Sequence, residues 1–481
     1  MIIVKINDES YSYDIHSLIK AFYPAEDVKV VPEDEDKNSD SNMPEFYVCA
    51  GTDKISIRID KDRSRILTKE VTAHDALLKD RAAYKSELKR TLYRALSEYT
   101  GRQLPWGTLT GIRPTKLAMT CLYEGMSKDD AAEYMKNFYL CSDTKAKLAA
   151  DIAERERRII NDIGADDNSY SLYIGIPFCP SRCLYCSFMS YPIAAHKDAV
   201  VGYIEAVKRE LDFVADSFSN RRLDSVYIGG GTPTTLSSKQ LKDLIGYVYE
   251  KIDLSHIREF TVEAGRADSI DDEKLAVLKE AGVDRISVNP QTFNEDTLKL
   301  IGRKATAAET VETYKLAREA GFDNINMDII LGLPGETIED IRYTLDMIKD
   351  LKPDDLTVHS LAVKRGSKLA ELLLENKKIS DTDVMLQNND IDYEEAMRLT
   401  EQTAAEIGLH PYYLYRQKNI RGNLENTGYA AEGKAGIYNI LMMEEVQDIV
   451  ACGAGTVSKR VRMQDDGNVL IERCDTHKDL K

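Results

Sequence analysis

The chain has 481 residues, of which 43% are hydrophobic and 30% are charged, and its formal net charge at pH 7 is −17. This length and composition are typical of a globular protein with two or three domains. The acidic balance argues against a nucleic-acid backbone or an anionic membrane surface as a partner.

Neither membrane insertion nor export is predicted. No apolar run reaches about 18 residues, so we expect no transmembrane helix. The first residues lack the basic leader and apolar core of a secretory signal peptide. Eight cysteines are too few for a disulfide framework in a chain of this length. These features predict a protein of a reducing, bacterial-type cytoplasm.

The N-terminal third predicts two regions. Residues 1–70 form a small α+β unit, in which the alternating runs 45–50 and 54–60 predict a hairpin. Residues 71–165 form a helical region. Apolar residues at helical spacing predict one long helix over 74–101 that stops at Gly101, and a further helix over 142–161.

From about residue 170, short β-branched runs alternate with amphipathic helices. We expect strands at 171–178, 225–230, 259–264, 285–290, 322–332 and 355–363. Helices fill the gaps, at 197–218, 238–251, 271–281, 308–320 and 337–350. Six such repeats predict an α/β fold, a partial (β/α)6 TIM-like barrel over residues 166–370. A mixed region over 371–481 follows, with a long helix over 383–409.

Three cysteines lie within one tight loop, at Cys179, Cys183 and Cys186. Thiolates are the usual ligands of iron–sulfur clusters, and a four-iron cluster takes four of them. No further cysteine follows before Cys452, so three thiolates would leave one iron open to an outside ligand.

A zinc site completed by His196 is the alternative to a cluster. It is disfavoured because structural zinc sites usually combine ligands from two separate loops, whereas one loop carries all three thiols here. The other cysteines are scattered and are expected to be small buried apolar residues; they are Cys49, Cys121, Cys141, Cys452 and Cys474.

Polar or glycine residues recur where each predicted strand ends. The Cys loop follows the first strand and the run GGGTPT (229–234) follows the second; the later strands end near Glu263, Gln291, Asp328 and His359. Because barrel chemistry is built at the carboxyl ends of the strands, this pattern predicts one site at that end. Taken singly, each residue has a plain structural alternative, such as a salt bridge, a helix cap or a core histidine.

The run CPSRCLYC resembles the CxxxCxxC signature of the radical S-adenosylmethionine superfamily. Within it, YIGGGTPT, TVEAGR, SVNPQTFNEDTLKLIGR and NMDIILGLPGET resemble the oxygen-independent coproporphyrinogen III oxidase family. The stretches LTGIRPTKLA and 412–430 are similar to its longer accessory paralogues, the coproporphyrinogen dehydrogenases.

This resemblance implies a [4Fe–4S] cluster on the three cysteines and S-adenosylmethionine at its open iron. It implies that Glu263 holds the methionine amino group and that Tyr185 lies near a second cofactor molecule. The other implied cofactor contacts are Tyr173, Gly230, Gly231, Thr232, Gln291, Arg303 and Asp328.

The implied reaction is oxidative decarboxylation of two coproporphyrinogen III propionates to vinyl groups, giving protoporphyrinogen IX in heme biosynthesis. The implied electron donor is a flavodoxin or a ferredoxin.

One position departs from the oxidase pattern, because Phe188 stands where the founding enzymes have a fourth cysteine. The related heme chaperones carry a similar Cys-x-Phe. Two alternatives therefore stay open: a radical enzyme acting on another substrate, and a heme-binding delivery protein. A heme carrier needs an axial ligand, for which His359, His410 and Cys452 are candidates.

The aromatic and basic run at 412–419 suggests a tetrapyrrole contact. The tyrosines would pack on the macrocycle and the cations would bind propionates. The residues concerned are Tyr412, Tyr413, Tyr415, Arg416 and Lys418, with Arg113 and Lys116 as further candidates. A plain amphipathic strand is the alternative.

Overall fold

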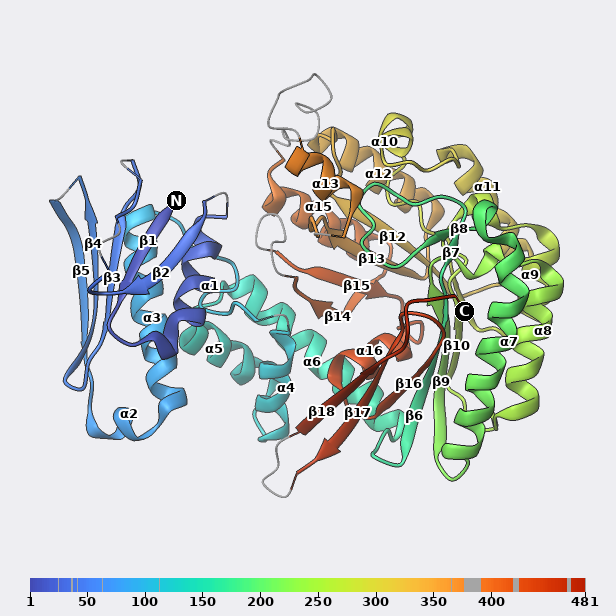
Figure 1. The fold of residues 1–481 in the computed structure, drawn as a ribbon, viewed down its shortest axis with the longest axis horizontal. Coiled ribbons are helices and arrows are strands. Elements are labelled where there is room, and N and C mark those ends of the chain that lie inside the picture. Colours follow the sequence, from blue (N-terminus) through green and yellow to red (C-terminus); the bar gives the residue numbers. More distant parts are fainter. Residues whose placement is uncertain are drawn as a thin grey trace. The chain divides into compact units, whose positions relative to one another are not determined.

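Figure 1 shows the computed structural model of the chain. It describes residues 1–480 except 25, 36, 37, 41, 63, 112, 365, 376–390, 418–423 and 465–468. The chain forms two compact units, residues 1–151 with 416–424 and residues 152–415 with 425–481. Within the described residues, no helix combines the length and the apolar character that a membrane span requires.

The first unit is built on a five-stranded sheet of order β2-β1-β3-β4-β5. Its strands are β1 (Ile2–Ile6), β2 (Val28–Pro32), β3 (Glu45–Ala50), β4 (Lys54–Lys61) and β5 (Ser64–Thr72). Strand β1 runs parallel to both β2 and β3, and β3, β4 and β5 are antiparallel. The predicted hairpin is therefore confirmed.

The helices of this unit, together with the helix that leads into the second, are α1 (Ser12–Phe22), α2 (Asp75–Lys79), α3 (Arg81–Thr100), α4 (Thr115–Tyr123), α5 (Lys128–Tyr139) and α6 (Asp143–Ile163), with a short η1 (Glu9–Tyr11). The prediction of one helix over 74–101 is wrong. The Asp80 side chain accepts hydrogen bonds from the N–H groups of Ala82 and Ala83, so it ends α2 and caps α3. The predicted stop at Gly101 is confirmed by its left-handed φ of 68°.

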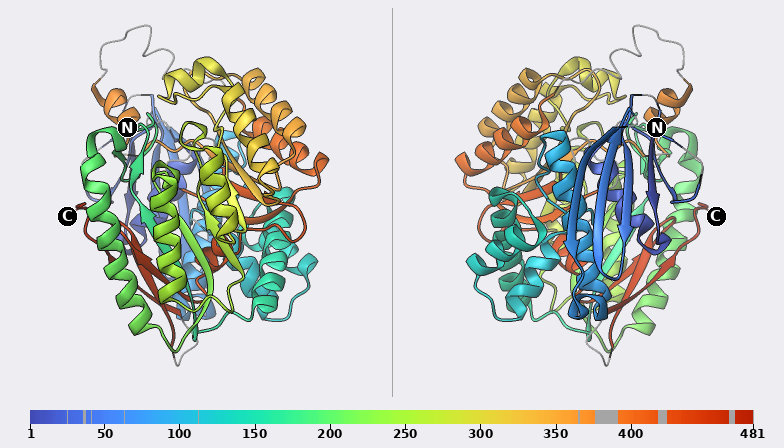
Figure 2. Two further views of the ribbon diagram at one scale, coloured as in Figure 1. Left: turned by 90° about the vertical axis from the view of Figure 1, so that its right-hand side faces the viewer. Right: turned by 90° about the vertical axis from the view of Figure 1, so that its left-hand side faces the viewer.

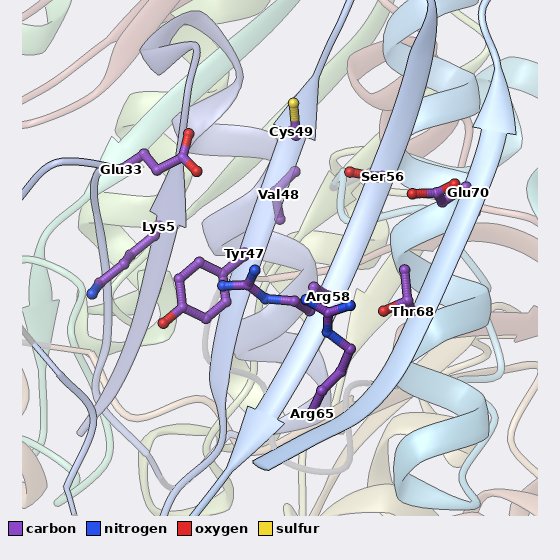
Figure 3. A pocket seen from close by; sticks show the side chains of 10 residues that line it. All are labelled: Lys5, Glu33, Tyr47, Val48, Cys49, Ser56, Arg58, Arg65, Thr68 and Glu70. Carbon is purple, nitrogen blue, oxygen red and sulfur yellow. The ribbon is translucent and has the colours of Figure 1, made fainter. Parts of the chain in front are cut away.

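The two faces of the first sheet differ. One face packs its apolar side chains, among them Ile55 and Ile57, into a core shared with α1 and α3. A polar cavity of about 170 Å³ is lined from β1, β3, β4 and β5 (Figure 3). There the Arg58 guanidinium lies over the Tyr47 ring, 3.8 Å from its centroid.

In the described residues, the second unit contains an eleven-stranded sheet of order β14-β15-β13-β12-β11-β10-β9-β6-β16-β17-β18. Seven neighbouring strands are parallel: β6 (Ser169–Ile176), β9 (Arg222–Gly230), β10 (Glu259–Val262), β11 (Arg285–Ser287), β12 (Ile325–Leu331), β13 (Asp355–Ser360) and β16 (Asp448–Cys452). All six predicted strands are confirmed, and β16 is an additional parallel strand.

Antiparallel strands extend this sheet at both edges. They are β14 (His410–Tyr415) and β15 (Asn426–Ala430) beside β13, and β17 (Val457–Met463) and β18 (Val469–Asp475) beside β16. The end strands β14 and β18 are not neighbours, so the barrel is partial, as predicted. A separate pair, β7 (Phe178–Cys179) and β8 (Tyr191–Pro192), flanks the Cys loop.

Helices cover the outside of the parallel strands (Figure 2, left). They are α7 (Ile193–Ser217), α8 (Ser238–Lys251), α9 (Asp272–Glu280), α10 (Glu295–Leu300), α11 (Ala307–Glu319) and α12 (Ile338–Leu351), with the short η2 (Pro233–Thr235) and η3 (Ala267–Ser269). The five helices predicted between the strands are confirmed.

The C-terminal region adds α13 (Lys368–Glu375), α15 (Tyr393–Glu406) and α16 (Ile437–Glu444). The predicted helix over 383–409 corresponds to α15. Its part over 383–390 lies outside the described residues, and residues 391 and 392, which were predicted to be helical, precede α15. Asp392 accepts hydrogen bonds from the Glu394 and Glu395 N–H groups and so fixes the start of α15.

The parallel strands alternate between an apolar and a polar face. Val226, Phe260 and Val288 belong to the buried apolar set under the helices. On the opposite face, Tyr227 of β9 lies beside Thr261 of β10 in the parallel register. Because successive strand residues point to opposite faces, the inner face of the partial barrel is polar along its length.

Candidate functional site

The Cys loop lies at the carboxyl end of the sheet, between β7 and β8 (Figure 1). The Thr232 hydroxyl donates to Cys179 Sγ at 3.6 Å, and Arg266 Nη1 donates to Cys183 Sγ at 3.6 Å. Burial is the main cause that raises the pKa of the Cys179 thiol to about 11, with the nearby Cys186 and Cys183 thiols contributing and the Thr232 hydrogen bond opposing the rise. The three thiols are therefore close enough to interact electrostatically.

The chemistry of the loop fits an iron–sulfur cluster. Ionising three buried, neighbouring thiols costs free energy, and the positive charge of the iron ions in a bound cluster would offset that cost. Donors to sulfur, here Arg266 and Thr232, are the contacts through which proteins tune such clusters. Among the described residues, no group of three His, Cys, Asp or Glu side chains is already arranged to hold a metal ion. His196 packs edge-on against Tyr191 at a kink in α7.

Hydrogen bonds fix the Cys loop to two other segments. The Leu184 N–H donates to the Ile301 carbonyl at 2.9 Å, and the Ser181 hydroxyl donates to the Gly302 carbonyl at 3.0 Å. The Leu369 N–H in turn donates to the Leu184 carbonyl at 2.9 Å. The loop is thus held against the turn before Arg303 and against α13.

The glycine turn after β9 lies directly beside the Cys loop. The Gly231 N–H donates to the Ile176 carbonyl at 2.8 Å, and the Thr232 N–H donates to the Phe178 carbonyl at 2.7 Å. A Cβ at Gly231 would lie 2.6 Å from the Phe178 oxygen, so only glycine fits this approach. Gly230 has a φ of 111°, which favours glycine as well.

Glu263 accepts two hydrogen bonds at the end of β10. The Tyr227 hydroxyl donates to Oε1 at 2.6 Å, and the Gly230 N–H donates to Oε2 at 3.2 Å. Burial, together with the negative charge of Asp328, raises the pKa of Glu263 to about 7. A cationic group bound beside this carboxylate would restore its ionised form.

Three stacked tyrosines lie beneath this carboxylate. Ring centroids are 5.9 Å apart for Tyr173 and Tyr227, and 4.6 Å apart for Tyr227 and Tyr438. Tyr438 comes from α16, whose first N–H groups donate to the buried Glu259 carboxylate at 2.7 and 3.1 Å. The C-terminal region therefore supplies a side chain to the interior of the barrel.

Both oxygens of Asp328 are held by amides. Asn289 Nδ2 donates to Oδ2 at 2.7 Å, and Asn326 Nδ2 donates to Oδ1 at 2.7 Å. Burial alone would raise the pKa of Asp328, but His359, whose Nε2 is 3.9 Å away, and Asn326 lower it below its usual value. A lowered pKa keeps this side chain a carboxylate.

Gln291 adopts a strained backbone conformation next to Asp328. Its φ is 67°, in the left-handed region. Its N–H donates to the Asp328 carbonyl at 2.8 Å, and its carbonyl accepts from the Ile330 N–H at 2.9 Å. The two bonds to β12 hold Gln291 in a conformation that an isolated chain would avoid, which is typical of binding sites.

Arg303 lies between the Cys loop and the end of β11. Its Nη1 donates to the Asn289 carbonyl, and its side chain interacts with Tyr185. The charge and hydrogen bond of Tyr185 raise the pKa of Arg303, which outweighs the opposing effect of burial. Its Nε is buried without a hydrogen-bond partner. The predicted cofactor contacts therefore come from the strands of one sheet and from the loops that follow them.

Sequence reasoning missed Arg266, Asn289 and Tyr438 as members of this site. Arg266 and Asn289 lie inside motifs that the resemblance used, and the polar alternation of the strands could have singled out Asn289. Tyr438 had no local signal, because it reaches the site from a helix far along the chain.

The predicted tetrapyrrole contact at 412–419 is wrong for Tyr412, Tyr413 and Arg416, whereas Tyr415 is partly exposed. Tyr412 and Tyr413 are buried, and the Tyr412 hydroxyl donates to Asp355 at 2.8 Å. Arg416 is buried, with Nη1 donating to the Leu109 carbonyl at 2.6 Å. Lys418 lies outside the described residues.

The remaining candidates are placed as follows. Arg113 and Lys116 belong to the first unit. Among the candidate axial ligands, His410 is exposed and Cys452 is buried within β16. His359 interacts with Asp328, and its Nδ1 lies 3.4 Å from the Tyr415 hydroxyl.

Comparison with known proteins agrees with this geometry. The profile of the Radical SAM superfamily matches residues 173–348. The oxygen-independent coproporphyrinogen-III oxidase-like protein HemZ of Bacillus subtilis is 42% identical over 78% of this chain and 74% of its own length. This chain belongs to that oxidase-like family of radical SAM proteins. Radical SAM proteins use a [4Fe–4S] cluster and S-adenosylmethionine.

Other radical SAM proteins match over a smaller part. The heme chaperone HemW of Bacillus subtilis is 38% identical over 40% of this chain, which spans about half (51%) of the chaperone. The structure of Escherichia coli coproporphyrinogen III oxidase (HemN) superposes with a TM-score of 0.51 at 21% identity, covering 67% of this chain and 70% of HemN. The HemN match confirms the fold class.

Proposed function

We propose that this chain catalyses the oxygen-independent decarboxylation of coproporphyrinogen III, converting propionates to vinyl groups and giving protoporphyrinogen IX. The observation that carries the proposal is the meeting of the Cys loop, Glu263 and Asp328 at one end of the sheet. The identity to an oxidase-like relative supports it. The proposal includes a cytoplasmic location and a flavodoxin or ferredoxin as electron donor.

In this proposal, Cys179, Cys183 and Cys186 hold the [4Fe–4S] cluster. The cluster, when bound, would supply one electron for the cleavage of S-adenosylmethionine, and that cleavage would supply the abstraction of a hydrogen atom from a substrate propionate. The propionate would then lose carbon dioxide and one electron to leave the vinyl group. Glu263 in its ionised form accepts hydrogen bonds from the methionine ammonium. Arg303 offers a planar guanidinium to a carboxylate.

The remaining residues orient the cofactor. Gly230, Gly231 and Thr232 form the turn that would contact the cofactor, and glycine at 231 lets this turn lie close to the Ile176 and Phe178 carbonyls. The two amides fix the Asp328 carboxylate, and His359 and Asn326 keep it ionised, so that it can accept hydrogen bonds from hydroxyl groups. Tyr173 on β6, Tyr185 in the Cys loop and Gln291 after β11 would contribute the remaining contacts.

Heme delivery is a second candidate function. Phe188 occupies the position of the fourth cysteine of the oxidases, and part of the chain is similar to the heme chaperone HemW. A radical enzyme acting on another substrate would share the cofactor site and differ only in what it binds at the mouth of the barrel.

An anaerobic turnover assay tests the proposal. Cluster-reconstituted, reduced protein is incubated with coproporphyrinogen III and S-adenosylmethionine, and the products are oxidised and separated by chromatography. We expect protoporphyrin, and none when Cys186→Ala replaces the wild type. Tight binding of heme with uncoupled cleavage of S-adenosylmethionine would instead favour heme delivery.

A further inference from the structure

We propose that Phe188 and Lys364 form a docking site for one pyrrole ring of a propionate-bearing tetrapyrrole, at the rim of the Cys loop. The inference rests on the proposed function and names the residues that would recognise its substrate class.

Phe188 is exposed to an unusual degree. Its relative exposure is 68%, although phenylalanine is among the residues most often buried in folded proteins. An exposed aromatic ring beside a reactive loop offers a flat apolar surface that gains free energy when a ligand covers it. Phe188 follows Cys186 by two residues, so a ring stacked on it would lie next to the predicted cluster.

Lys364 supplies the charge that an anionic ring substituent requires. Its Nζ lies 5.6 Å from the centroid of the Phe188 ring, in cation–π geometry, and the side chain is exposed. An ammonium beside an aromatic ring matches a pyrrole ring that carries a carboxylate arm.

The two residues are held together by the fold. Arg182 of the Cys loop donates from Nη2 to the Gly366 carbonyl, two residues beyond Lys364. The Leu369 N–H donates to the Leu184 carbonyl at 2.9 Å. The Cys loop and the segment after β13 therefore present Phe188 and Lys364 as one surface, with the exposed Arg182 as a second cation nearby.

Binding of two stable tetrapyrroles tests the site. Coproporphyrin III and hemin are titrated separately into the full-length, cluster-reconstituted protein, and the shift of the main absorption band gives each Kd. We expect Phe188→Ala and Lys364→Glu each to weaken binding about tenfold, and Phe188→Tyr and Lys364→Arg to retain it. Phe213→Ala is the matched control, because Phe213 on α7 is also 68% exposed. It should bind as the wild type does.

The outcomes separate the site from the proposed function. A loss for coproporphyrin III supports the site in an oxidase, and a loss confined to hemin supports the same site in a heme carrier. If Phe188→Ala and Lys364→Glu both bind tetrapyrrole as tightly as the wild type does, the docking site is overturned and the proposed function is not. If wild-type protein binds neither tetrapyrrole, the site and the proposed function are both overturned. Iron content and the urea midpoint of each variant establish that it is folded and loaded.

Discussion

Asn289 and Asp328 are joined by two hydrogen bonds of opposite direction. Asn289 Nδ2 donates to Asp328 Oδ2 at 2.7 Å, and the Asp328 N–H donates to Asn289 Oδ1 at 3.2 Å. The Asn289 carbonyl also accepts from Arg303. One asparagine on the loop after β11 therefore positions two of the predicted cofactor contacts.

Asn289→Ala should lower the affinity for S-adenosylmethionine about tenfold. It removes the side chain that holds the Asp328 carboxylate, and the same side chain helps to fix the Asn289 backbone carbonyl that Arg303 binds. Asn289→Asp should lower it further, since two carboxylates would then meet. Equilibrium dialysis with cluster-loaded protein measures the effect. Asn137→Ala, on an exposed side chain of the first unit, is the control. An unchanged affinity in Asn289→Ala would show that Asp328 needs no such support.

The pKa of Glu263, raised to about 7, predicts a pH-dependent affinity for S-adenosylmethionine. The ammonium of the ligand needs an ionised carboxylate, so affinity should rise from about pH 6 to about pH 8 and release a proton on binding at the lower pH. Calorimetry in buffers of different ionisation enthalpy counts that proton. Glu263→Gln should bind S-adenosylmethionine more weakly and should release no proton on binding.

The same raised pKa has a consequence for stability. Between the ordinary value of 4.5 and about 7, the folded ligand-free protein holds a proton on Glu263 that the unfolded chain releases. The free energy of unfolding should therefore fall as pH rises through this window, and Glu263→Gln should flatten that part of the curve. Urea unfolding of both proteins at a series of pH values measures it. Parallel curves would contradict the raised pKa.

Two glycines should respond to alanine in opposite ways. Gly231→Ala should destabilise the protein by about 1–3 kcal/mol, because the new Cβ would lie 2.6 Å from the Phe178 oxygen and 2.9 Å from the Ile176 oxygen. Gly246→Ala, in α8 with nothing within 4 Å, should stabilise it by about 0.5–1 kcal/mol. Equal changes in urea midpoint would show that the turn tolerates a side chain.

Gln291→Gly should leave stability nearly unchanged, while the affinity for S-adenosylmethionine falls. Glycine relieves the strain of the φ of 67°, but it also removes a buried side chain that is only 7% exposed. Lys352→Gly provides the comparison. Lys352 has a φ of 51° at the end of α12, so Lys352→Gly relieves the same kind of strain and should leave the affinity unchanged. A variant at 291 that keeps its affinity would remove Gln291 from the site.

The sequence by itself determined the features that depend on neighbours along the chain. The spacing of Cys179, Cys183 and Cys186 and the alternation of polar and apolar residues on the strands are local patterns. Secondary structure and the face of a strand follow from such patterns, so the parallel strands, their helices and the end of the sheet that carries the predicted site could all be predicted.

Only the tertiary structure decided which distant residues meet. The Arg416 guanidinium is the kind of group that binds propionates. It is nevertheless buried, and it donates a hydrogen bond to the Leu109 carbonyl, 307 positions earlier. Tyr438 joins the barrel because Glu259, 179 positions earlier, caps its helix. Contacts of this kind depend on strand order and on the burial of partners far apart in the chain, and no periodicity in the sequence encodes them.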